Sequence, residues 1–88
     1  MRTIKELLIL LREKCVTRIP EAMYGLCGAI DWLVSCDDIS LDESYELYYY
    51  VEINKPKEVA SAYWWPRGEL APRLEFLDKL IAECDEKI

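Results

Sequence analysis

The sequence predicts an all-α fold of about four helices, and three kinds of pattern predict it. Two apolar runs follow a Ser/Thr-x-x-Glu capping box, in which side chains satisfy the free backbone N–H groups of a helix start. Two prolines stand where a helix can open, because proline at a first helical position lacks only an N–H that would be unpaired anyway. Apolar residues recur at helical spacing in four segments. The expected helices span about 3–16, 20–35, 41–53 and 72–87, with a Trp- and Pro-rich loop before the last.

The first expected helix, about 3–16, opens with the capping box Thr3-x-x-Glu6. Ile9 and Leu10 lie off its apolar stripe, so we expect this helix to be covered on more than one side, for instance by a second copy of the chain. The stripe itself consists of Ile4, Leu7, Leu8, Leu11 and Cys15.

The second expected helix, about 20–35, opens at Pro20 and carries small residues on one face. Two glycines, Gly25 and Gly28, would each cost about 1 kcal/mol relative to alanine inside a helix. The small face therefore predicts the close approach of either another helix or a ligand. The expected core stripe is Met23, Leu26, Cys27, Ile30, Leu33 and Val34.

The third expected helix, about 41–53, follows the capping box Ser40-x-x-Glu43. The tyrosine run at residues 48–51 has the composition of a strand, but the capping box and the flanking Glu46 and Glu52 favour a helix. We expect its tyrosines to form a half-buried surface or an interface between molecules.

The loop at residues 63–73 has the sequence Tyr-Trp-Trp-Pro-Arg-Gly-Glu-Leu-Ala-Pro-Arg. One interpretation is that the tryptophans fill a small core. The other is a binding loop, because aromatic faces stack on flat ligands and arginine grips phosphate or carboxylate. Both hold if one tryptophan points inward and the other outward. The candidate ligand-binding residues are Tyr63, Trp64, Trp65, Arg67 and Arg73.

The last expected helix, about 72–87, opens at Pro72, which places Arg73 among the free N–H groups of a helix start, where an anion is favoured. Its apolar stripe consists of Leu74, Leu77, Leu80, Ile81 and Cys84.

Length and charge limit the possible functions. We expect 88 residues to form one domain, 1–88, whose stability is thin unless it oligomerises. The net charge is −6. Residues 1–18 hold five basic and two acidic side chains, whereas residues 31–52 hold seven acidic ones and no lysine or arginine. An acidic chain repels nucleic acid, so general nucleic-acid binding is not expected, although a local pocket for a small anion is possible.

The sequence supplies little for catalysis, and we expect neither an enzyme nor a cofactor. It contains no histidine, the usual acid–base group near neutral pH, and no phosphate-binding loop. The four cysteines form no CxxC pair, and Asp37, Asp38 and Asp42 lack the spacing of a calcium loop, so no metal site is expected. No secretory signal or membrane-length apolar run is visible, which favours reduced thiols in a cytosol.

Two segments resemble small uncharacterised accessory proteins of tailed bacteriophages. They are Gly25-Leu26-Cys27 with Ile30, and Tyr63-Trp64-Trp65-Pro66-x-Gly68 with Pro72-Arg73 and Phe76-Leu77. The resemblance covers roughly a third of the chain. It brings no established activity or catalytic residues, but it implies a role against host defences in the bacterial cytosol.

These observations lead to two functional hypotheses. In the first, the chain sequesters a nucleotide-derived immune signal without cleaving it: a tryptophan stacks on a base, and the loop arginines, helped by the cations of the first helix, hold phosphates. A stacked base contributes roughly 1–3 kcal/mol and each charge-assisted hydrogen bond roughly 1.5–3. One loop can therefore supply somewhat less than about 10 kcal/mol. Nanomolar binding needs about −12 kcal/mol, so this hypothesis implies a homo-oligomer, in which a second chain adds the missing contacts. In the second, the acidic segment 31–52 occupies a basic site on a host defence protein or nucleic-acid-binding protein.

Overall fold

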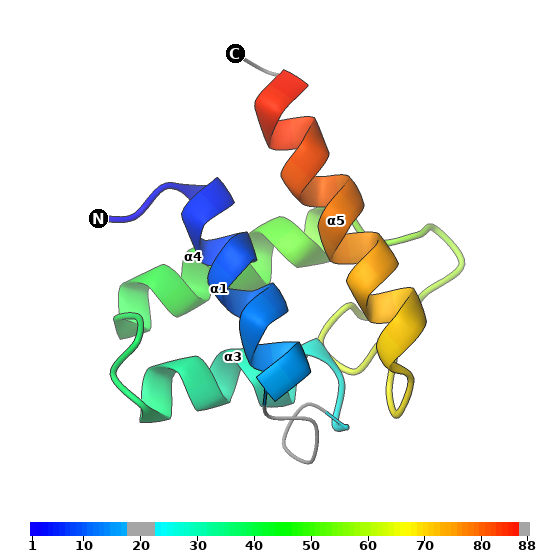
Figure 1. Cartoon of the computed structure of the whole chain (residues 1–88). Helices are drawn as coiled ribbons and strands as arrows, with labels where there is room; N and C mark the ends of the chain where they lie inside the picture. Colours follow the sequence, from blue (N-terminus) through cyan, green and yellow to red (C-terminus); the bar gives the residue numbers. More distant parts are fainter. Residues whose placement is uncertain (18–22, 87–88) are drawn as a thin grey trace.

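The computed structural model describes residues 1–17 and 23–86, which form four α-helices and no strand. The helices are α1 (Ile4–Thr17), α3 (Leu26–Ser35), α4 (Leu41–Ile53) and α5 (Leu70–Glu86) (Figure 1). The all-α prediction is confirmed. The helical interpretation of residues 48–51 is also confirmed, because they lie inside α4.

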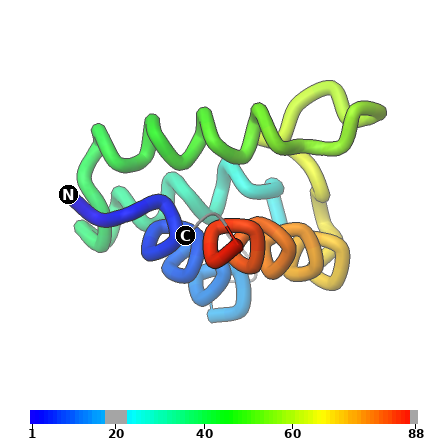
Figure 2. The backbone as a smooth tube through the Cα atoms, turned by 90° about the horizontal axis from the view of Figure 1, so that it is seen from above, coloured from blue at the N-terminus to red at the C-terminus, as the bar shows by residue number. Residues whose placement is uncertain are grey.

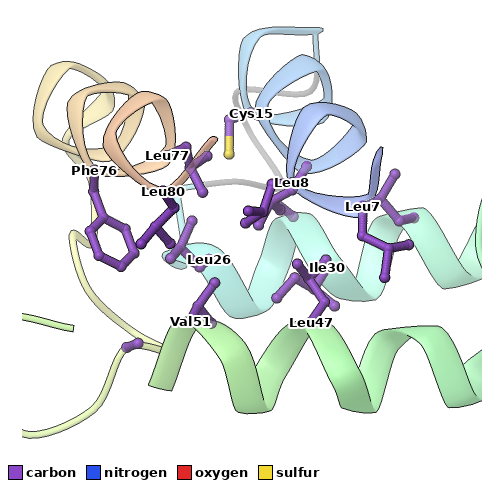
Figure 3. Close-up of a cluster of buried hydrophobic side chains, with 14 of the residues drawn as sticks. Leu7, Leu8, Cys15, Leu26, Ile30, Leu47, Val51, Phe76, Leu77 and Leu80 are labelled. Carbon is purple, nitrogen blue, oxygen red and sulfur yellow. The ribbon is translucent and has the colours of Figure 1, made fainter. Parts of the chain in front are cut away.

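Helix α1 is the centre of the packing, because it contacts α3, α4 and α5. Helices α1 and α5 lie side by side on one side of the core, and α4 lies on the opposite side (Figures 2 and 3). Leucines of α1 and α5 meet apolar side chains of α3 and α4 between these layers (Figure 3). The fully buried side chains of this core include Leu7, Leu8, Leu11, Leu26, Ile30, Leu47, Val51 and Leu77.

Both predicted capping boxes are present. The Glu6 N–H donates to Thr3 Oγ1 at 3.2 Å, and the Thr3 N–H donates to Glu6 Oε1 at 2.9 Å. The same exchange joins Ser40 and Glu43, at 3.1 and 2.9 Å. These reciprocal bonds satisfy backbone donors that a helix start leaves free, which is why α1 and α4 begin where the sequence predicts.

The second helix begins later than predicted. Its expected opening at Pro20 lies outside the described residues, and residues 23–25 form a turn before α3. Gly25 has a φ of 91°, a conformation that a helix cannot contain. Met23 is consequently 45% exposed, so its predicted place in the core stripe is wrong, whereas Leu26, Ile30 and Leu33 are buried as expected.

The last helix begins earlier than predicted, at Leu70 instead of Pro72. Pro72 is the third helical residue, still within the first turn, where a missing N–H breaks no intrahelical bond. None of the helices in the described residues is both long enough and apolar enough to cross a membrane.

Candidate functional site

The Trp-rich loop is attached to the start of α3 by backbone hydrogen bonds. The Cys27 N–H donates to the Tyr63 carbonyl at 2.7 Å, and the Gly68 N–H donates to the Met23 carbonyl at 2.9 Å. Cys27 is the second residue of α3, so its N–H has no partner within the helix. Gly25, at the N-cap, supplies no side-chain cap. The loop therefore performs the capping that a serine or aspartate would otherwise supply.

Gly25 allows this attachment. A Cβ added at Gly25 would lie 2.5 Å from the carbonyl carbon and oxygen of Trp64, closer than two such atoms can approach. The small face of the second predicted helix indicated a close approach by another helix or a ligand. At Gly25 the approaching group is neither of these, but the loop backbone.

The two neighbouring tryptophans face different ways. Trp64 is 53% exposed. Trp65 is half-buried and packs edge-to-face on Phe76, with ring centroids 5.2 Å apart. Tyr63 is partly exposed, and its ring meets the ring of Tyr48 edge-on at 4.6 Å. One tryptophan thus belongs to the packing of α5 and the other to the surface.

The two loop arginines also differ. Arg67 is exposed, whereas Arg73 is only 2% exposed. The Arg73 Nη2 donates to the Pro66 carbonyl at 2.7 Å, and its Nε has no partner among the described residues. Arg73 therefore joins the loop to α5 from inside. Its predicted contact with a ligand stays untested, and would require the loop to move away from α5.

The cations near the N-terminus are engaged within the chain. Arg2 bonds Glu43 at 2.9 Å, and Arg12 bonds Asp78 at 2.6 Å. Lys5 pairs with Asp85, and Lys14 with Asp38. These four cations therefore offer a phosphate less positive charge than the sequence alone suggests.

A polar cluster beneath the loop joins α3 to α4. The Tyr48 hydroxyl donates to Asp31 Oδ1, and the Cys27 thiol donates to Asp31 Oδ2 at 3.5 Å. Burial raises the pKa of Tyr48 and that of Cys27 above their ordinary values. Cys27 is thus a protonated thiol near neutral pH and a poor nucleophile. All four cysteines are free, and no group of potential ligands in residues 1–17 and 23–86 is arranged to hold a metal ion.

A row of exposed apolar side chains lies on α4. Four of its residues, spaced by four, are between 56% and 68% exposed. We call them the α4 row; they are Leu41, Tyr45, Tyr49 and Ile53. Asp42 and Glu46 are exposed on the same helix, which contains no lysine or arginine. The sequence predicts that these tyrosines form a half-buried surface or an interface. Tyr48 is half-buried, but Tyr45 and Tyr49 are exposed, and the regular spacing by four is the signal that could have revealed an exposed stripe.

A second surface feature is an apolar groove of about 480 Å³ between the loop and α5. Trp65 lines it, so one predicted site residue lies in a concave position. Phe76 is its edge-to-face partner there. We call this feature the α5 groove; its lining residues are Pro56, Trp65, Pro72, Glu75, Phe76 and Lys79.

Comparison with known proteins adds no assignment to this geometry. No protein family, curated protein or solved structure matches the chain.

Proposed function

We propose that this chain is a non-catalytic binding protein of the bacterial host cytosol, whose α4 row docks on a basic segment of another protein. The observation that carries the proposal is the α4 row itself: four large apolar side chains, each more than half exposed, on one helix. Contiguous exposed apolar surface rimmed by polar groups is typical of interaction sites. Tyrosine is also enriched among the residues that dominate binding energies.

Charge selects the kind of partner. Asp42 and Glu46 flank the row, and residues 31–52 contain no lysine or arginine. A second copy of the chain is a poor occupant, because two facing α4 rows would bring carboxylates together. The four paired cations of residues 2–14 are also already engaged with carboxylates of their own chain. A basic partner instead gains from the negative surface in both approach rate and specificity.

The length of the row fits a helical or extended segment. Its first and last residues, Leu41 and Ile53, are twelve positions apart on a helix, which corresponds to about 18 Å. An amphipathic segment with apolar and basic side chains could contact the whole row along one side.

A direct test is a titration of the isotope-labelled protein with a helical peptide that carries leucines on one face and lysines on the other. Amide shifts in two-dimensional NMR should concentrate on α4. Tyr49→Ala should weaken binding by more than tenfold, as expected for a tyrosine near the centre of an interface. Tyr24→Ala is the matched control, because Tyr24 is 58% exposed but lies before α3.

A second pair of variants tests how much negative charge contributes to peptide binding. Glu46→Lys should weaken binding of the same peptide, whereas Glu58→Lys, an equal charge change at an exposed site outside α4, should have little effect. Absence of peptide binding, shifts centred away from α4, or equal losses for the α4 variant and its control would each contradict the proposal.

The sequestration of a nucleotide signal by the loop stays a prediction. Two groups assigned to it are engaged within the fold: Arg73 is buried against Pro66, and the α1 cations form ion pairs. The surface part of the predicted loop site consists of Tyr63, Trp64 and Arg67.

A further inference from the structure

We propose that the α5 groove is a nucleotide-binding site in which Trp65 and Phe76 contact the base and Lys79 contacts the phosphate. This inference does not depend on the proposed role of the α4 row. It rests on the lining of the groove, on its volume and on the charges that the ion pairs of the fold leave free.

The apolar lining suits a flat ring. Trp65 and Phe76 meet at an interplanar angle of 82°, so the pair presents both a ring face and a ring edge. Pro56 and Pro72 add two rigid rings, and the space of about 480 Å³ falls in the range of small-molecule sites. Base–aromatic stacking tolerates any base, because every base has a π-face.

The charges in the groove indicate which flat molecule fits. Lys79 lines the groove and makes no ion pair with any described residue, unlike the four paired cations of residues 2–14. Its ammonium can therefore approach a phosphate. Glu75 lies on the same helix and also lines the groove. A carboxylate only accepts hydrogen bonds, so it can receive one from the exocyclic amino group of adenine, cytosine or guanine. Uracil offers only its ring N3–H, which is flanked by two carbonyl oxygens that a carboxylate repels.

Lys79 and Glu75 must contact different ends of the ligand. A phosphate next to Glu75 would be repelled, whereas a phosphate at Lys79 with the amino edge at Glu75 uses both side chains favourably. The groove is thus expected to prefer a nucleotide with an amino-bearing base over inorganic phosphate or a uridine nucleotide.

The test uses adenosine 5′-monophosphate (AMP), uridine 5′-monophosphate (UMP) and adenosine as probes, with the indole N–H resonances of the tryptophans as the readout. Trp65→Phe and Trp64→Phe assign the two loop resonances. AMP should shift the Trp65 resonance and leave the Trp64 resonance in place. Lys79→Glu should weaken AMP binding roughly five- to tenfold at low salt and leave adenosine binding unchanged, since an exposed ion pair is modest in strength and screened by ions.

Two further variants separate the groove from the alternatives. Glu75→Gln should reduce the preference for AMP over UMP, because a charge-assisted hydrogen bond is replaced by a neutral one. Lys57→Glu is the matched control for Lys79→Glu: both residues are exposed lysines, but Lys57 lies outside the groove lining. Far-UV circular dichroism should show that these exposed-site variants are folded.

Several results would overturn the inference. A shift of the Trp64 resonance with dependence on Arg67 would place binding on the loop surface instead. Equal effects of Lys79→Glu on AMP and adenosine would remove the phosphate contact. The absence of any AMP-induced shift at millimolar concentration would also refute it. The same holds if the groove binds a proline-rich peptide but not AMP. Glu46→Lys should not alter AMP binding, so failure here and failure of the α4 proposal can be told apart.

Discussion

Replacing Gly25 with alanine should severely destabilise the protein, and the comparison with Gly68→Ala shows why. Both glycines have positive φ angles, 91° at Gly25 and 74° at Gly68. They differ in their surroundings. A Cβ at Gly25 would lie 2.5 Å from the Trp64 carbonyl group, whereas the nearest atom to a Cβ at Gly68 is the end of the Met23 side chain, at 3.7 Å.

The magnitude follows from two contributions. A positive φ costs a residue with a Cβ roughly 1–2 kcal/mol in the left-handed helical region. At Gly25 the cost is roughly 1–3 kcal/mol, because its ψ of −167° lies in a region that essentially only glycine occupies. At Gly25 the backbone of Trp64 must also move by about 1 Å to reach ordinary contact distance. That movement would break or strain the bond from the Cys27 N–H to the neighbouring Tyr63 carbonyl. A backbone donor left unpaired costs about 1–3 kcal/mol, so Gly25→Ala should cost roughly 2–6 kcal/mol in total.

Urea unfolding followed by tryptophan fluorescence and far-UV circular dichroism measures both variants. Gly68→Ala should lower the free energy of unfolding by the smaller, conformational amount, and Gly25→Ala by at least 1 kcal/mol more. In a domain of this size each kcal/mol lowers the melting temperature by about 4–8 °C. Equal losses for the two variants would show that the contact with Trp64 contributes nothing, and would refute the role given to Gly25 in attaching the loop.

Three further predictions concern stability and assembly. Arg73→Ala should destabilise the fold by about 1–3 kcal/mol, because it leaves the buried Pro66 carbonyl unpaired; a urea midpoint equal to that of the parent would contradict this. Hydrogen bonds from the backbone N–H groups of Ser40 and Arg2 lower the pKa of Glu43 from 4.5 to about 2. Because its pKa is lower in the folded state, the ionised carboxylate stabilises the fold fully above pH 4.5, and this stabilisation is lost as the pH falls toward about 2. Glu43→Gln should therefore flatten the loss of urea stability in that pH window, and an unchanged slope would contradict the assignment. Light scattering should show a homodimer or larger assembly that leaves the α4 row free, as the exposed apolar side chains Ile9 and Val16 of α1 predict; a 10.3 kDa particle at high concentration would exclude it.

The helices could be predicted because their signals are local. A capping box occupies four consecutive residues, and an apolar stripe repeats within two turns, so neither needs knowledge of distant contacts. Met23 is wrongly predicted to be in the core because that prediction also rests on local spacing alone. Its spacing matches the stripe of α3, but the loop that attaches to residues 23–27 contains Tyr63 and Gly68, some forty positions away.

The pairing of the charges could not be predicted, because the ion pairs join residues that are far apart in the sequence. Residues 1–18 have a net positive charge in the sequence, which suggested cations available to a phosphate. In the fold, Arg12 pairs with Asp78 and Lys5 with Asp85, residues 66 and 80 positions away. Composition measures how much charge a segment carries, whereas the tertiary contacts determine which charges remain free for a partner.

The motif that suggested a binding loop is largely explained by the way the loop is held. The Tyr63 carbonyl caps α3, the Trp64 backbone lies on Gly25, and the Pro66 carbonyl accepts from Arg73. These are also residues on which the predicted resemblance to phage proteins rests, and that resemblance stays a prediction. The motif therefore says little about the identity of a ligand. Apart from Trp65, the residues proposed to contact a partner lie beside the motif, on α4 and on α5, where the sequence shows only a stripe of tyrosines and an ordinary amphipathic helix. The function of such a chain is therefore better sought by changing Tyr49 and Lys79 than by changing Gly25 or Arg73, because changes at these two positions destabilise the fold together with any activity.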